Sequence, residues 1–142
     1  ELRGIIAAAG VPFLVKGVMT ARGAEKALEA GAAGVIVSNH GGRVLDGTPS
    51  TAEVLPEIVQ AVHGRALVLV DGGLRSGLDV FRALALGADA ALIARPFVTA
   101  VYGGGAEGVK AYVDKLQAEL ADTMAMCGAH TIREITRDMV RV

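Results

Sequence analysis

The residues best suited to chemistry form one short run, Ser38-Asn39-His40-Gly41-Gly42-Arg43. An imidazole that can accept a proton lies three residues before a guanidinium that can bind a carboxylate. Gly41 and Gly42, which stand between them, would let a flat ligand come close to the backbone. The run follows the apolar stretch Gly34–Val37, so we expect it at the carboxyl end of a buried strand. A base beside an anion-binding group is the pair that oxidation of a hydroxy acid requires.

Polar or glycine-rich residues follow the other apolar runs of the chain as well. Those runs are Phe13–Val15, Leu67–Val70 and Ala90–Ile93, and they lead into Lys16, into Asp71–Gly77 and into Ala94–Pro96. Ligands of parallel α/β proteins gather where strands end and helices begin. We therefore expect the polar groups of all four strand ends to share one opening.

The segment Asp71–Gly77, with the sequence DGGLRSG, favours binding of an anion. Its closely spaced glycines leave backbone N–H groups free at the start of a helix. Arg75 adds a bidentate partner for phosphate, and Arg95 supplies a second guanidinium at the next strand end. The pattern predicts a phosphate site between the last two strands.

Each of these residues also has an ordinary structural interpretation. Lys16 could be a lysine whose stem packs and whose ammonium is solvated. His40 could be a loop histidine hydrogen-bonded to the backbone, and Arg43 could be a surface arginine paired with Asp46. The glycines of Asp71–Gly77 could simply serve a strand-to-helix turn. What favours function is that the four strand ends carry such groups together.

The apolar runs are continuous rather than alternating, which is typical of strands buried on both faces. Helical patterns occupy Ala21–Ala30, Thr51–Val62 and Gly77–Leu86. This alternation predicts right-handed crossovers and a parallel sheet. Two βαβα units also repeat each other, since Val15-Lys16-Gly17 is echoed by Val70-Asp71-Gly72. Four βα units are half of an eight-stranded TIM-type (βα)8 barrel, which typically needs roughly 250 residues.

The carboxyl-terminal part follows a different pattern. Gly103–Gly105 interrupts the chain, Glu107–Met126 predicts a long amphipathic helix, and Thr131–Glu134 predicts the capped start of a short final helix. We expect one domain over residues 1–142, with four βα units in 1–102 and a helical tail in 103–142. It could be a free half-barrel or the second half of a larger protein.

Composition excludes several classes of function. The net charge of −1 provides no basic field for nucleic acid or an anionic membrane, and the apolar runs are too short to span a bilayer. The single cysteine, Cys127, cannot form an intrachain disulfide, which fits a cytoplasmic location. The cysteine and histidine residues lack the spacing of metal ligands, so we expect no metal site.

Taken together, these motifs resemble those of the FMN-dependent α-hydroxy acid oxidases and dehydrogenases, which include glycolate oxidase, lactate oxidase and mandelate dehydrogenase. The resemblance rests on Ser38–Asp46, on Asp71–Gly77 and on Arg95-Pro96-Phe97. It covers essentially the whole chain, but it extends only to the carboxyl-terminal half of those barrels.

The resemblance implies FMN as cofactor, His40 as the catalytic base that also contacts the substrate, and Arg43 as the clamp on the carboxylate of a 2-hydroxy acid. Lys16 would lie by N1 and the C2 oxygen of the flavin, and Asp71 would bind the ribityl chain. The cofactor-binding residues implied are Lys16, Ser38, Gly41, Asp71, Gly72, Gly73, Leu74, Arg75, Ala94 and Arg95. Ala94 stands where the family usually has glycine, and its methyl group could crowd the phosphate slightly.

The resemblance also implies that important groups come from elsewhere. In the family, the amino-terminal half supplies tyrosines near the substrate and an aspartate that orients the base. We therefore expect FMN-dependent oxidation of a 2-hydroxy acid to a 2-keto acid from the full barrel, and weak activity or none from this chain alone.

Two alternatives stay open from the sequence. The chain could be a non-catalytic half-barrel that holds FMN or another phosphate ligand. Its exposed strand edges would then favour a homo-oligomer or pairing with an amino-terminal half-barrel. It could also be another barrel enzyme, such as an isopentenyl diphosphate isomerase or an inosinate dehydrogenase, although the base-plus-arginine run argues against both.

Overall fold

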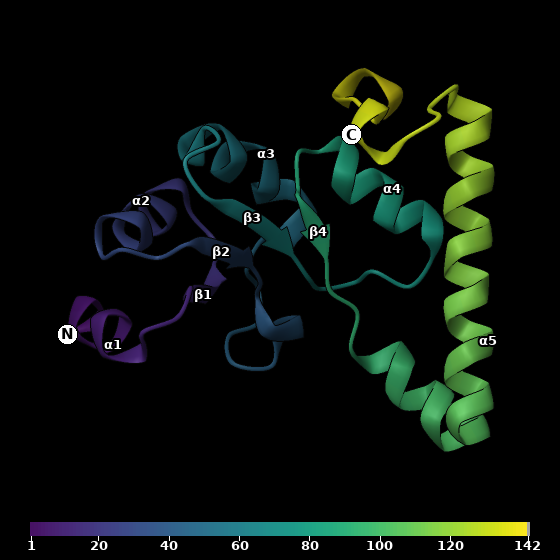
Figure 1. Cartoon of the computed structure of the whole chain (residues 1–142), viewed down its shortest axis with the longest axis horizontal. Helices are drawn as coiled ribbons and strands as arrows, with labels where there is room; N and C mark the ends of the chain where they lie inside the picture. Colours follow the sequence, from purple (N-terminus) through teal and green to yellow (C-terminus); the bar gives the residue numbers. More distant parts are fainter. Residues whose placement is uncertain (142) are drawn as a thin grey trace.

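The computed structural model describes residues 1–141 and centres on one parallel sheet (Figure 1). The sheet has four strands in the order β1-β2-β3-β4. The strands are β1 (Leu14–Val18), β2 (Gly34–Val37), β3 (Leu67–Val70) and β4 (Ala90–Ala91). The predicted parallel sheet of four βα units is confirmed, but the last strand is two residues shorter than the apolar run Ala90–Ile93.

The strands pair in register, so that their carboxyl ends reach the same edge of the sheet. Lys16 lies opposite Ile36, and Ile36 lies opposite Leu69. The ladder between β1 and β2 contains a bulge at Gly17, whose φ is +95°. A bulge bends a strand and redirects the neighbouring side chain, and here that neighbour is Lys16.

Three helices connect the strands, and each begins at a side-chain cap. They are α2 (Ala21–Glu29), α3 (Thr51–Val62) and α4 (Gly77–Ala85). Thr20 Oγ1 accepts from the N–H of Gly23 at 3.0 Å, and Ser50 Oγ accepts from that of Glu53 at 3.3 Å. Figure 1 shows these helices along one side of the sheet, as right-handed crossovers require. A further helix, α1 (Leu2–Ala9), precedes β1 and was not among the expected elements.

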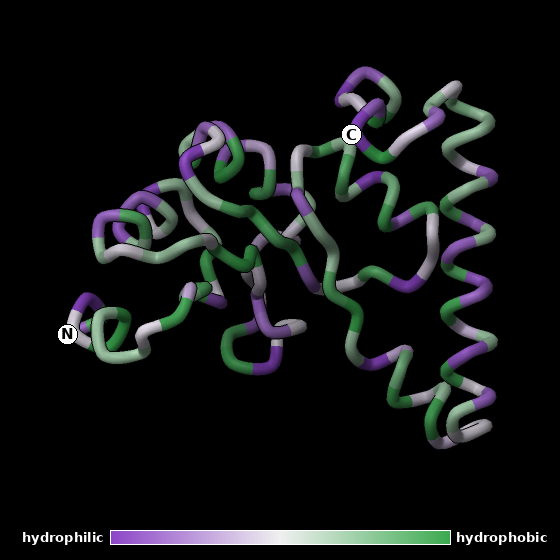
Figure 2. The backbone as a smooth tube through the Cα atoms, in the orientation of Figure 1, coloured by the Kyte–Doolittle hydropathy of each residue, from purple (hydrophilic) through white to green (hydrophobic). Residues whose placement is uncertain are grey.

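The core lies between this helical layer and the sheet. Figure 2 shows hydrophobic residues along the strands, whereas hydrophobic and hydrophilic residues alternate along the helices. The fully buried side chains of the core include Val35, Val37, Leu55, Ile58 and Val70.

The expectation that the strands are buried on both faces is correct for β2 and wrong for the others. Every residue of β2 is buried, but Lys16 and Gly17 of β1, Leu67 of β3 and Ala90 of β4 are exposed. The reason is that the helices cover one face of the sheet, and β1 and β4 form its edges.

The carboxyl-terminal part differs from expectation in its first and last segments. Helix α5 begins at Arg95 and ends at Cys127, with a break at Gly104 and Gly105, where the backbone leaves helical conformation. The glycine interruption is thus confirmed, but a helical segment precedes it. We call residues 106–127 of α5 the tail helix. The expected final helix is instead two 3-10 turns, η2 (Ile132–Glu134) and η3 (Arg137–Met139), and Thr131 provides no side-chain cap. Every helix within residues 1–141 is too short or too polar to cross a lipid bilayer.

The tail helix packs closely on α4 at Gly77. A Cβ at Gly77 would lie 2.3 Å from the backbone nitrogen of Leu120 and 2.5 Å from the carbonyl oxygen of Leu116. Leu120 and Met124 also pack against the buried Phe81 and its neighbours. Residue 77 must therefore be glycine for the two helix backbones to approach this closely.

We expect Gly77→Ala to lower the free energy of unfolding by about 1–3 kcal/mol, because an added methyl group meets backbone atoms that cannot move independently. Urea denaturation of the variant and the wild-type chain measures the difference. Gly4→Ala is the matched control, since its Cβ would meet nothing within 4 Å. An equal decrease of the free energy of unfolding in the two variants would contradict the close packing at Gly77.

The amino terminus of α4 depends on a capping box. Ser76 Oγ accepts from the N–H of Asp79 at 3.1 Å, and Asp79 Oδ2 accepts from the N–H groups of Arg75 and Ser76 at 3.0 and 3.1 Å. Burial acts to raise the pKa of Asp79, but the hydrogen bonds from Ser76 and Arg75 outweigh it and lower that pKa below its ordinary value. The ionised carboxylate therefore stabilises the fold.

We expect Asp79→Ala to lower the free energy of unfolding by about 1 kcal/mol at neutral pH. The deficit is fully present above the ordinary aspartate pKa of about 4 and shrinks as the pH falls through the lowered value in the folded state. Urea denaturation at a series of pH values measures the deficit against wild type, with the exposed Asp122→Ala as control. A deficit for Asp79→Ala that did not change with pH would show that the carboxylate charge is irrelevant.

Candidate active site

A hollow of about 830 Å³ opens at the carboxyl ends of the strands. It is lined by side chains or backbone from all four strand ends, as the sequence predicts. The expected site residues on its wall are Lys16, His40, Gly41, Arg43, Asp71, Gly72, Gly73, Leu74, Arg75, Ala94 and Arg95. Ser38 is the expected residue that is not on this wall.

Ser38 instead contacts Lys16, and it is Lys16 that connects the ends of three strands. Lys16 Nζ donates to Ser38 Oγ at 2.7 Å and forms an ion pair with Asp71 Oδ2 at 2.6 Å. Ser38 is buried, whereas 45% of the Lys16 side chain is exposed. The ammonium group is therefore fixed in place by two neighbours and still faces the hollow.

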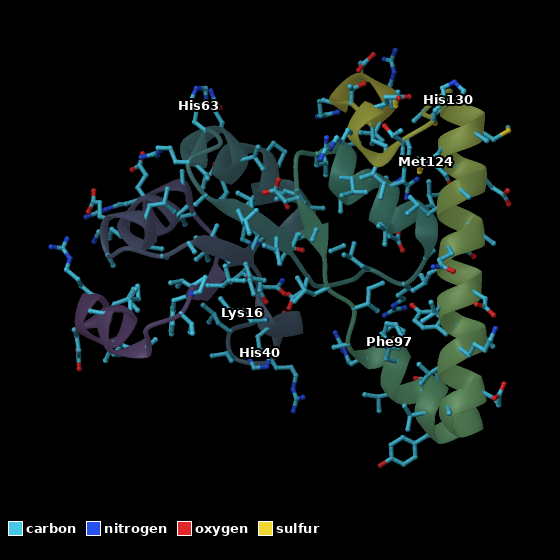
Figure 3. All side chains as sticks on the ribbon, viewed as in Figure 1. Lys16, His40, His63, Phe97, Met124 and His130 are labelled. Carbon is cyan, nitrogen blue, oxygen red and sulfur yellow. The ribbon has the colours of Figure 1, made fainter. Side chains whose placement is uncertain are left out.

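His40 and Arg43 lie on the loop that follows β2, on the 3-10 turn η1 (His40–Gly42) and at its end. Figure 3 shows His40 close to Lys16 on the same side of the sheet. The backbone of His40 has a φ of +56°, which is uncommon for a residue with a side chain, and its N–H donates to Ser38 Oγ at 3.2 Å. Ser38 therefore positions both the ammonium of Lys16 and the backbone that carries the imidazole.

Arg43 is exposed and is not paired with Asp46 in the described chain, residues 1–141. Asp46 Oδ1 accepts instead from the N–H of Gly47 at 2.9 Å. Arg43 lines the hollow, and its guanidinium is available to a carboxylate.

Arg95 reaches from the end of β4 across to the loop after β2. A Cβ at Gly41 would lie 2.7 Å from Arg95 Nη2, so a side chain at this position would displace the guanidinium. Gly41 also has a φ of +67°, which a side chain would strain. The arginine thus bridges the part of the hollow near His40 and the part near Asp71–Gly77.

Several residues that line the hollow have backbone donors with no acceptor among residues 1–141. The N–H groups of Gly73 and Leu74, in the turn after β3, make no hydrogen bond there, and neither does that of Ala94 in the turn after β4. All three residues line the hollow together with the guanidinium groups of Arg75 and Arg95. Unpaired N–H groups beside two cations form a suitable binding site for a phosphate group, whose charged oxygens accept hydrogen bonds.

Two residues of the tail helix reach this turn, and sequence reasoning missed both. Tyr112 Oη donates to the carbonyl oxygen of Arg75 at 2.9 Å, and Glu119 Oε2 accepts from the N–H of Gly77 at 2.8 Å. A hydrogen bond from Lys115 and the one from Gly77 lower the pKa of Glu119, and burial raises that of Tyr112. Both groups are therefore in the forms that these bonds require at neutral pH, a carboxylate and a phenol.

Known proteins resemble this chain in sequence and in fold. The family model for FMN-dependent dehydrogenase matches residues 1–142. A peroxisomal (S)-2-hydroxyacid oxidase of Arabidopsis thaliana is 55% identical over 131 residues, which are 92% of this chain and 36% of that protein. A 2-hydroxyacid oxidase of Dictyostelium discoideum is 45% identical over 140 residues, which are 99% and 36% of the two proteins.

A solved structure, mandelate oxidase with benzoyl-formic acid, superimposes with a TM-score of 0.92 at 43% identity. The match covers 96% of this chain and 41% of that one. This chain therefore spans little more than a third of the length of the curated relatives described above. Its four βα units form half of an eight-stranded barrel. On the match of the family model to its whole length, the chain belongs to the FMN-dependent dehydrogenase family.

Proposed function

We propose that this chain supplies the base and the phosphate-binding end of an enzyme that oxidises a 2-hydroxy acid to a 2-keto acid with FMN. The observation that carries the proposal is the single hollow that His40, Arg43, Lys16 and the two arginine-bearing turns line together. Family membership supports the cofactor, and relatives named as 2-hydroxyacid oxidases support the class of substrate.

The residues around the hollow suit FMN. The free N–H groups of Gly73, Leu74 and Ala94 and the two guanidinium groups form a donor set for a terminal phosphate. Ala94, where the resemblance implies glycine, carries the same backbone N–H donor that glycine would. Asp71 would accept from ribityl hydroxyl groups, and Lys16 would place a positive charge beside the ring system. When bound, FMN would accept the hydride equivalent that leaves the substrate.

The chain's own residues would bind the hydroxy acid and move its proton. Arg43 would hold the carboxylate through paired N–H donors, which fixes the orientation of the substrate. The imidazole of His40 would accept the proton of the substrate. Lys16, held by Ser38 and Asp71, would stabilise negative charge without moving.

We infer a reducing compartment for the protein, because Cys127 has no second cysteine in this chain to pair with. The sequence favours the cytoplasm. The Arabidopsis relative is named as peroxisomal, so we include the peroxisome in the proposal.

We expect the purified chain to bind FMN, and any slow bleaching of the bound flavin by glycolate, lactate or mandelate to depend on His40. In His40→Gln, FMN binding should persist while bleaching slows by about 10²–10⁴-fold, because a positioned base contributes that much. Flavin absorption under anaerobic conditions measures both.

His63→Gln is the matched control, since His63 is exposed at the end of α3 and does not line the hollow. A chain that did not bind FMN would refute the proposed cofactor site. Bleaching at the wild-type rate in His40→Gln would refute the base.

We further propose that the open edges of the sheet associate with four more βα units. β1 and β4 are each paired on one side among residues 1–141, and edge strands readily pair with another chain. In the longer relatives an amino-terminal half would fill this place. In the purified chain a second copy would do so, because the internal repeat makes the junction between β4 and a second β1 resemble that between β2 and β3.

Sedimentation of the purified chain should accordingly show a species of about twice the 14.5 kDa mass of one copy. The mass should stop at two copies as the concentration rises, because two halves close a barrel and leave no edge. A well-folded monomer, or growth into larger species, would contradict closure.

A further inference from the structure

Within the segment Gly72–Leu74, Leu74 packs against the core, but Gly73 is exposed and a Cβ there would meet nothing within 4 Å. Gly72 and Gly73 have φ values of +93° and +82°. The three residues line the large hollow and also a second one of about 460 Å³ toward α3 and α4. A glycine-rich loop with open space beside it must be held by anchors at its ends, because ordering such residues costs conformational entropy.

Arg75, the next residue, is anchored on both sides of its backbone. Its N–H donates to Asp79 Oδ2 at 3.0 Å, and its carbonyl oxygen accepts from Tyr112 Oη at 2.9 Å. One anchor comes from α4 and the other from the tail helix. The backbone of the residue that carries the first guanidinium is thereby fixed between two helices.

Tyr112 also contacts the turn that carries the second guanidinium. Its ring meets that of Phe97 edge to face, with centroids 5.0 Å apart and planes at 77°. Phe97 donates its N–H to the carbonyl oxygen of Ala94 at 3.0 Å, so it belongs to the first turn of the helix that Arg95 begins. Figure 3 shows Phe97 at this turn, beside the tail helix. One side chain therefore touches both arginine-bearing turns.

The tail helix can hold Tyr112 accurately because its own position is fixed. Glu119 accepts from the N–H of Gly77, and the missing Cβ of Gly77 lets the helix backbones meet. Lys115 pairs with Glu119 and keeps it oriented. These contacts lie one and two turns along the helix from Tyr112, on the side that faces α4.

We propose that Tyr112 is a positioning residue for the phosphate end of the flavin site. Its hydroxyl group holds the turn after β3 in position, and its ring does the same for the turn after β4. Together they fix the distance between the two sets of phosphate donors. This inference rests on the proposed function.

The test compares Tyr112→Phe with the wild-type chain, using FMN and riboflavin as ligands. The variant keeps the ring contact with Phe97 and removes the hydrogen bond to Arg75. We expect the Kd for FMN to rise about fivefold, the effect of one neutral hydrogen bond, and the Kd for riboflavin, which lacks the phosphate, to stay unchanged. Quenching of flavin fluorescence measures both constants, and hydrogen exchange at Arg75 and Ser76 should become faster without any ligand.

Tyr102→Phe is the control, because Tyr102 is 89% exposed. Unchanged FMN binding and exchange in Tyr112→Phe, with normal binding by the wild type, would overturn the positioning role and leave the proposed function standing. Equal weakening of both ligands would show a general structural effect and would also overturn it. A wild-type chain that bound neither ligand would refute the proposed function and this inference with it.

Discussion

The in-register parallel pairing of β1, β2 and β3 is the constraint on which the site depends. Lys16 lies on β1 and Asp71 directly follows β3, so two strand spacings of about 4.8 Å, roughly 10 Å across the sheet, separate them. A lysine side chain can cross that distance only if both strands end at the same level. The ion pair between them, with Ser38 beneath it, shows that they do. A slip of one residue would turn Lys16 toward the helices and separate these groups.

The tail helix adds a second constraint of a different kind. It contributes no group to the chemistry we propose, yet it contacts the turn after β3 through Tyr112 and Glu119 and the turn after β4 through the ring of Tyr112. The two turns come from different βα units and are joined through the sheet by a short β4. A helix packed across both makes their relative position depend on side-chain contacts as well as on strand pairing.

Local pattern was sufficient to predict the order of the strands and the three connecting helices, but not all strand bounds, since Lys16, expected after the first strand, lies within β1. It was not sufficient where distant partners decide the outcome. The apolar run of β3 reads as buried, but Leu67 is exposed because helices cover one face of the sheet. Tyr112 lies 37 residues from the carbonyl group that it binds, and nothing in the spacing of the tail pairs them. The positive φ of His40 was equally hidden, since it results from the hydrogen bond of its N–H to Ser38 and from the glycines that follow.

The pairing of Lys16 with Asp71 also shapes how a ligand would approach. The charge of Lys16 is balanced by that of Asp71, whereas Arg43, Arg75 and Arg95 line the hollow without an ion-pair partner among residues 1–141, although the chain as a whole has a net charge of −1. On α2 the exposed glutamates are balanced by Arg22 and Lys26. The mouth of the hollow is thus positive, whereas the chain as a whole is nearly neutral. Such a field turns and draws a small anion toward the mouth during diffusion, so association should be fast in dilute buffer and slow down as added salt screens the field.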